Sequence, residues 1–185
     1  MKEFYLVSLK ELEINQKLNL TMGNENIPYW NVENLYTESD VKNKLAELYP
    51  NGISLHGIKY LSEKFEFPKF NEKDYVSYIS MIELTFELVR KIKFKDKPSR
   101  FVSVFGCETL EQAKIFRENY RMNKGEIFKV VAEKWGKFDM NFLYLGASII
   151  GNQILIEKYW SGKSSKNPFW EVLMTGDITV VEKIK

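Results

Sequence analysis

Glu171 stands alone among apolar residues near the end of the chain. Trp170 precedes it, Val172 and Leu173 follow it, and a glycine at 176 separates this apolar run from a second one. The pattern predicts a pair of strands over 169–182 joined by a turn at the glycine. A carboxylate in such company either points to solvent or takes part in chemistry, and the residues by themselves leave both readings open.

A Gly-Lys-Ser sequence at 162–164 resembles the end of a phosphate-binding loop. That loop needs a glycine at the position where Glu157 stands, and it needs a helix to follow, whereas Pro168 and an apolar strand pattern follow here. We therefore predict a solvated loop. The two rings before it, Tyr159 and Trp160, either wall a pocket or cap the core at a helix end, and both readings stay open.

The chain has one histidine, His56, and one cysteine, Cys107. Zinc sites take several such ligands, so we expect no metal site. No nucleophile pattern accompanies His56, which we interpret as a loop residue between two turn glycines. A single cysteine cannot form an intrachain disulfide, which fits a reducing compartment, and we interpret Cys107 as a small buried side chain.

Length and charge limit the classes of function. A chain of 185 residues fits one domain, 1–185, with a substantial core. Its 27 basic and 25 acidic residues give a net charge of +2, which predicts no binding to nucleic acid or to an anionic membrane. There is no apolar run long enough to span a bilayer and no secretion signal, so we expect a cytoplasmic protein.

The elements that must position these residues follow from hydrophobic periodicity and capping signals. Strands are predicted near 4–8, 100–105, 126–132 and 169–182, and helices near 37–49, 71–92, 109–122, 139–145 and 153–160. On the long helix, Glu83, Glu87 and Arg90 fall opposite the apolar stripe and are predicted to face solvent. Short strands separated by helix-rich stretches favour an α+β fold with helices packed on a mixed or antiparallel sheet.

Three segments, taken in order, resemble the ADP-ribosyltransferase fold, a split sheet that grips NAD. The last segment fits best: the family places a catalytic glutamate at the start of a late strand, followed by aliphatics, a turn and a second aliphatic strand. Glu171, Val172, Leu173, Gly176 and Val180 match that frame. By this resemblance Glu171 is the catalytic residue, bonding the ribose 2′-hydroxyl and stabilising an oxocarbenium-like transition state.

The other two segments match in part. In the strand pattern from 100 to 105, Ser103 corresponds to the family serine that holds the glutamate. Val104 and Phe105 replace the later polar positions of that motif, and the ring of Phe105 is expected to stack on nicotinamide. On the first strand, Leu6 stands where the family has histidine or arginine, with Tyr5 beside it as a substitute. Phe169 replaces a second acidic or amide residue, so arginine is not expected as the acceptor.

The whole chain also resembles an uncharacterised group of small proteins from Bacillus-like bacteria assigned to the same fold. The shared features are a Phe-Tyr-x-Val-Ser start, an Arg-x-x-Ser-x-Phe strand with the helix after it, and a Tyr-Trp-Ser-Gly to Trp-Glu-Val-Leu end. This resemblance covers most of the chain and implies an ADP-ribosyltransferase-like split sheet with flanking helices.

The resemblance implies an enzyme that uses NAD as a substrate, a transferase or a glycohydrolase. Glu171 and Ser103 would be its catalytic pair, and the rings of Tyr5, Phe105, Tyr159 and Trp160 would bind the dinucleotide. Two alternatives remain. The leucine on the first strand favours a non-catalytic binding module on the same fold, and the high aromatic share of 15% is compatible with a dimerising protein, that is, a homodimer.

Overall fold

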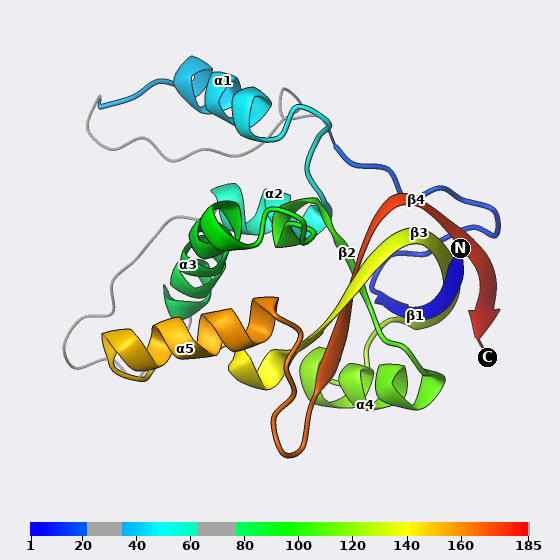
Figure 1. The fold of residues 1–185 in the computed structure, drawn as a ribbon. Coiled ribbons are helices and arrows are strands. Elements are labelled where there is room, and N and C mark those ends of the chain that lie inside the picture. Colours follow the sequence, from blue (N-terminus) through cyan, green and yellow to red (C-terminus); the bar gives the residue numbers. More distant parts are fainter. Residues whose placement is uncertain (22–34, 63–76, 185) are drawn as a thin grey trace.

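A curled antiparallel sheet forms one side of the computed structural model, which describes residues 1–21, 35–62 and 77–184 (Figure 1). Its four strands lie in the order β1-β3-β4-β2. Their bounds are Lys2–Ser8 for β1, Val104–Gly106 for β2, Glu126–Asp139 for β3 and Trp170–Ile184 for β4. The predicted α+β class with an antiparallel sheet is confirmed.

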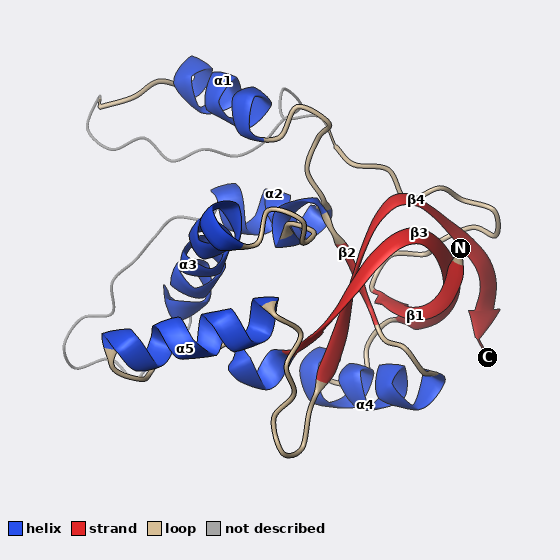
Figure 2. Cartoon of the chain, viewed as in Figure 1, coloured by secondary structure: helices blue, strands red, loops and turns tan. Residues whose placement is uncertain are grey.

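Three helices, α2, α3 and α5, lie together on one side of the sheet, α4 lies below it, and α1 lies farther from it (Figure 2). Two 3-10 turns complete the described elements. The bounds are Glu38–Leu48 for α1, Leu55–Ser62 for α2, Ser77–Lys93 for α3, Leu110–Arg121 for α4, Ile149–Trp160 for α5, Arg100–Val102 for η1 and Met140–Phe142 for η2. The predicted helices near 37–49, 109–122 and 153–160 are confirmed; the predicted start of the long helix, near 71, lies outside the described residues.

The curl of the sheet is closed by its two outer strands. β1 pairs with β3 along its whole length, and the backbones of Tyr5 and Cys107 exchange two hydrogen bonds, of 2.9 and 2.7 Å, at the end of β2. Alternating side chains therefore point into the curl or outward. The inward set is a buried apolar cluster that contains Phe4, Phe128, Val130, Ala132, Val172, Met174, Ile178 and Val180.

The outward face of the sheet packs against helices. α3 and α5 cover one part of it with a ring-rich core: Phe86, Phe138, Phe142, Ile156, Tyr159, Trp160 and Leu173. Within this core Trp160 is fully buried and its indole N–H donates to the Phe86 carbonyl at 2.9 Å. Five aromatic side chains of this core fill the space between these helices and the sheet.

The chain from 169 to 182 is one strand, not the predicted strand pair. Gly176 has φ +75°, a conformation that glycine adopts readily, but the chain continues in the same direction. The pairing register shifts there, from Ala132 with Ile178 to Lys134 with Thr175. The glycine therefore marks a β-bulge, and its partner strand β3 is correspondingly longer than the predicted 126–132.

The predicted strand over 100–105 is wrong in its first half, and the predicted helix over 139–145 is reduced to a 3-10 turn over Met140–Phe142. Ser99 caps the turn η1, its hydroxyl accepting from the Phe101 N–H at 3.2 Å, and only Val104–Gly106 pairs with β4. In the same way Asp139 accepts from the Asn141 N–H and caps η2, which ends at Phe142. In each case a side chain that accepts from the backbone N–H two residues on begins a 3-10 turn, and at Asp139 this turn follows directly on the end of β3.

We predict that Gly57→Ala destabilises the protein by roughly 1–3 kcal/mol, because α2 packs directly on η1. A β-carbon at position 57 would lie 2.3 Å from the Phe101 carbonyl oxygen, which also accepts two hydrogen bonds from Ser54. Urea unfolding followed by circular dichroism measures the change. Lys59→Ala, at an exposed site on the same helix, is the control, and equal stability of the two variants would contradict the close packing.

Candidate functional site

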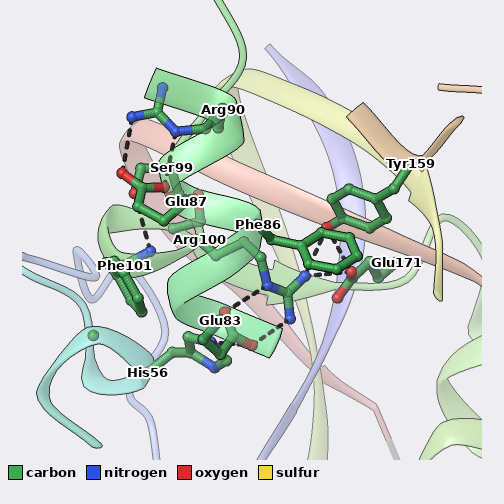
Figure 3. Close-up of polar contacts among 12 residues, drawn as sticks. His56, Glu83, Phe86, Glu87, Arg90, Ser99, Arg100, Phe101, Tyr159 and Glu171 are labelled. Carbon is green, nitrogen blue, oxygen red and sulfur yellow. Dashed lines mark hydrogen bonds and ion pairs between the residues drawn. The ribbon is translucent and has the colours of Figure 1, made fainter. Parts of the chain in front are cut away.

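Arg100 lies at the centre of a buried polar cluster where η1, α2, α3, α5 and β4 meet. The cluster consists of His56, Glu83, Arg100, Tyr159 and Glu171, and is called the Arg100 cluster below. Figure 3 shows the guanidinium of Arg100 between Glu83 on one side and Tyr159 with Glu171 on the other. Ionised side chains are seldom buried without partners, so the contacts within the cluster decide whether it can exist.

The guanidinium of Arg100 binds both carboxylates. Its Nε and Nη2 donate to the two oxygens of Glu83, at 2.8 and 3.0 Å, in the two-pronged geometry that suits arginine. Its Nη1 donates to Oε1 of Glu171 at 2.5 Å and to the Tyr159 hydroxyl at 2.6 Å. Burial would lower the pKa of Arg100, but the charges of Glu171 and Glu83 outweigh it and raise that pKa.

Tyr159 completes the orientation of Glu171. Its hydroxyl accepts from Arg100 and donates to Oε1 of Glu171 at 2.7 Å. Burial raises the pKa of Tyr159 well above its ordinary value, so the hydroxyl keeps its proton and remains a donor. Oε1 of Glu171 thus receives two hydrogen bonds, while Oε2 accepts none from the residues that the structure describes.

His56 approaches the cluster from α2. Its Nε2 lies 3.0 Å from Oε1 of Glu83. The orientation of the two groups does not meet the geometry of a hydrogen bond, and Nε2 has no other hydrogen-bond partner among the described residues. Burial lowers the pKa of His56 despite the attraction of Glu83, so the ring is neutral at pH 7. Burial alone would raise the pKa of Glu83, but Arg100 and His56 lower it to about 2.

Rings cover this side of the cluster. The His56 ring lies 4.4 Å from that of Phe105 and 4.6 Å from that of Tyr60, between ring centres, and the Arg100 guanidinium lies 4.8 Å from the Phe105 ring centre. Phe105, Tyr60 and His56 are each partly exposed. They therefore form the boundary between the buried charges and solvent.

The charges of the cluster do not cancel. One guanidinium faces two carboxylates, and the imidazole is neutral, which leaves one net negative charge at a largely buried position. A negative charge with little access to water favours a cationic group that can approach it. The arrangement is therefore suited to holding one carboxylate oxygen in place and to stabilising positive charge beside it.

Residues 4–185 match a family described as a protein of unknown function, DUF2441. The chain belongs to the DUF2441 family. No curated protein matches it.

The sheet of this DUF2441 protein brings Cys107, and not Ser103, next to Glu171. Val104 pairs with Met174 and Gly106 with Val172, so the next residues along the two antiparallel chains, Cys107 and Glu171, lie close together. Ser103 lies at the opposite end of β2, is 1% exposed, and donates its hydroxyl to the Ser99 carbonyl at 2.6 Å. The role expected of Ser103, orienting the glutamate, is filled here by Arg100 and Tyr159.

The predicted ring residues separate into different environments. Phe105 lies over Arg100 at the partly exposed boundary, while Tyr159 and Trp160 are fully buried, which fits the reading that they cap the core. Tyr5 packs with Cys107 and Ala113 under α4. The pKa of Cys107 is raised to about 12 by burial and by Glu171, so the thiol stays protonated, as expected of a small buried side chain.

Sequence patterns missed three members of the Arg100 cluster, namely His56, Glu83 and Arg100. Glu83 was predicted to face solvent but is 3% exposed, and Glu87 is likewise buried against Arg90. His56 lies on α2 rather than in a loop. The available signal was the scarcity of arginine: with only four in the chain, an arginine directly before an apolar run is unusual enough to indicate a buried partner.

Two general findings concern the described part of the chain. None of its helices is long and apolar enough to cross a membrane. Within ranges 1–21, 35–62 and 77–184, no three histidine, cysteine, aspartate or glutamate side chains gather closely enough to hold a metal ion.

We predict that Arg100→Met costs about 3–5 kcal/mol of stability, because it leaves two buried carboxylates without their cation. Chemical denaturation measures the loss, and Arg121→Met, at an exposed helix end, is the control. Combining Arg100→Met with Glu83→Gln and Glu171→Gln removes all three charges. We expect this triple variant to regain part of the loss; no recovery would show that the guanidinium contributes packing rather than charge.

We also predict that stability falls in two stages as the pH is lowered. A pKa that is lower in the folded protein makes the unfolded chain take up the proton first, so stability is present at higher pH and is lost on acidification. The first stage begins near pH 6.5 and comes from His56, the only histidine. The second includes Glu83, between its ordinary value of 4.5 and about 2.

Urea unfolding at a series of pH values measures both stages. The His56→Asn variant should lack the first stage and keep the second, because no other histidine is present. An unchanged first stage in this variant would contradict the assignment to His56.

Proposed function

We propose that this DUF2441 protein binds NAD and cleaves it at the bond between nicotinamide and ribose, as an ADP-ribosyltransferase-like enzyme or an NAD glycohydrolase. The observation that carries the proposal is the state of Glu171. Arg100 and Tyr159 hold its Oε1, while Oε2 accepts no hydrogen bond from the described residues. A carboxylate fixed through one oxygen is preorganised to use the other.

The reaction requires stabilisation of positive charge on the ribose. As the bond from C1′ to the nicotinamide nitrogen breaks, its electron pair goes to nicotinamide and the sugar becomes oxocarbenium-like. Oε2 of Glu171 would accept from the ribose 2′-hydroxyl and face this charge. Water or an acceptor hydroxyl then bonds to C1′ and loses its proton.

The net charge and the rings support the same ligand. The nicotinamide ring of NAD is cationic, and the Arg100 cluster carries one uncompensated negative charge. Phe105 and His56 offer partly exposed ring surfaces beside that charge. A flat cation is favoured both by the carboxylate and by contact with aromatic faces.

We predict that Glu171→Gln lowers nicotinamide release from NAD by at least about a hundredfold while NAD binding persists, because the amide cannot provide the negative charge. Calorimetry measures binding and chromatography measures released nicotinamide. Asp177→Asn, which removes an exposed carboxylate from the same strand, should retain full turnover. Circular dichroism of each variant confirms that the fold is intact. Equal turnover by wild type and Glu171→Gln, or no binding at millimolar NAD, would refute the enzyme proposal.

A non-catalytic binding module is the second candidate, and one observation favours it. Glu171 is 5% exposed and already paired with a buried arginine, which is also what a structural ion pair requires. This candidate predicts NAD binding without nicotinamide release in the wild type. The same two measurements therefore separate the candidates.

A further inference from the structure

A hollow of about 550 Å³ lies away from the Arg100 cluster, where the bulge of β4 faces the turn after α1 and the end of α3. Its size is within the range of small-molecule sites. It is lined by Leu18, Asn19, Leu20, Leu48, Tyr49, Pro50, Asn51, Gly52, Arg90, Lys91, Ser99, Val102, Val104, Thr175, Gly176 and Ile178. Val104 lines it while Phe105 lies on Arg100, so the hollow and the cluster occupy opposite faces of β2.

The charged residues of this lining are all cations. Arg90 and Lys91 contribute positive charge, and no aspartate or glutamate is among the lining residues. Arg90 is already committed, since its Nε and Nη2 donate to Glu87 at 2.9 Å each and its Nη1 donates to the Lys97 carbonyl. Its charge is therefore largely balanced, and these hydrogen bonds hold its side chain in one position at the edge of the hollow.

Lys91 differs from Arg90 in its partners. Its ammonium group lies 5.0 Å from the centre of the Tyr49 ring, and it makes no ion pair with any carboxylate in the described ranges. Lys91 is partly buried, and its ammonium group lies over a ring rather than beside an anion from the described residues. An anion entering the hollow would supply the missing partner.

The rest of the lining divides by chemistry. Aliphatic side chains from the segment after β1, from η1 and from β2 and β4 provide an apolar wall, represented by Leu18, Val102 and Ile178. Ser99 and Thr175 add hydroxyl groups. A ligand that satisfies both parts has an anionic head for Lys91 and an apolar body for the aliphatic wall.

We propose that this hollow is a binding site for a small organic anion with an apolar body. The site is separate from the one at Glu171 and does not depend on NAD chemistry. The carboxylate or phosphate head of the ligand pairs with Lys91, and the body packs on Val102, Val104 and Ile178. Arg90, whose charge is largely balanced by Glu87, forms a fixed part of the lining next to Lys91.

The test uses three probes on the full chain: hexanoate, which has head and body, 1-hexanol, which has the body alone, and inorganic phosphate, which has the head alone. Methyl NMR detects each by shifts at Val102, Val104 and Ile178. We expect hexanoate to bind more tightly than either other probe. Lys91→Gln should weaken hexanoate at least about tenfold, the loss typical of a hydrogen bond to a charged group, and leave 1-hexanol unchanged.

Two further variants make the result specific. Lys91→Arg should keep hexanoate binding, because it retains the charge, and Lys95→Gln, at an exposed position outside the lining, should not affect it. Absence of hexanoate shifts at these methyl groups, or equal binding by wild type and Lys91→Gln, would overturn the proposal. Displacement of hexanoate by NAD would overturn the separation of the two sites.

Discussion

The burial of Arg100 between two carboxylates is the constraint on which the arrangement of the helices depends. Glu83 comes from α3, Glu171 from β4 and Tyr159 from α5, and each contributes a bond to one guanidinium. Removing α3 or β4 would leave a buried charge without an ionic partner, and removing α5 would break the hydrogen bonds of Tyr159 to Arg100 and Glu171. The desolvation cost of such an ion is several kcal/mol, so the elements are held in one mutual geometry.

The curled sheet prepares the position of this cluster. Tyr5 and Cys107 close the curl through backbone hydrogen bonds, and alternation along β4 then turns Val172 and Met174 inward and Glu171 outward. Asp139, pairing with Trp170 at the start of β4, accepts hydrogen bonds from the backbones of Ser165 and Phe169. It thereby fixes the loop that enters β4 directly before Glu171.

The local elements could be predicted from the sequence because their causes are local. The helix predicted to start at Thr37 does so through a capping box with Asp40, and Thr109 caps α4 by accepting from the Gln112 N–H. The Arg100 cluster has no local cause. Arg100 is separated by 17 residues from Glu83 and by 71 from Glu171, and its burial follows only from their meeting in space. Helical periodicity predicts that Glu83 faces solvent, because periodicity identifies only the apolar face of a helix. It cannot detect a buried ion pair on another face. Gly176 likewise has a turn residue's signature, and only pairing with β3 makes it a bulge.

The ion pair of Glu171 with Arg100 is compatible with the proposed chemistry because the cluster holds more negative than positive charge. If Arg100 faced Glu171 alone, the pair would be neutral and a developing cation beside it would gain little. Glu83 binds the same guanidinium through both of its oxygens and so shares its charge. Glu171 therefore keeps part of its negative potential while its orientation is fixed by Arg100 and Tyr159. Glu83 on α3 therefore influences the negative potential of Glu171, at the start of β4, although the two carboxylates are joined only through Arg100.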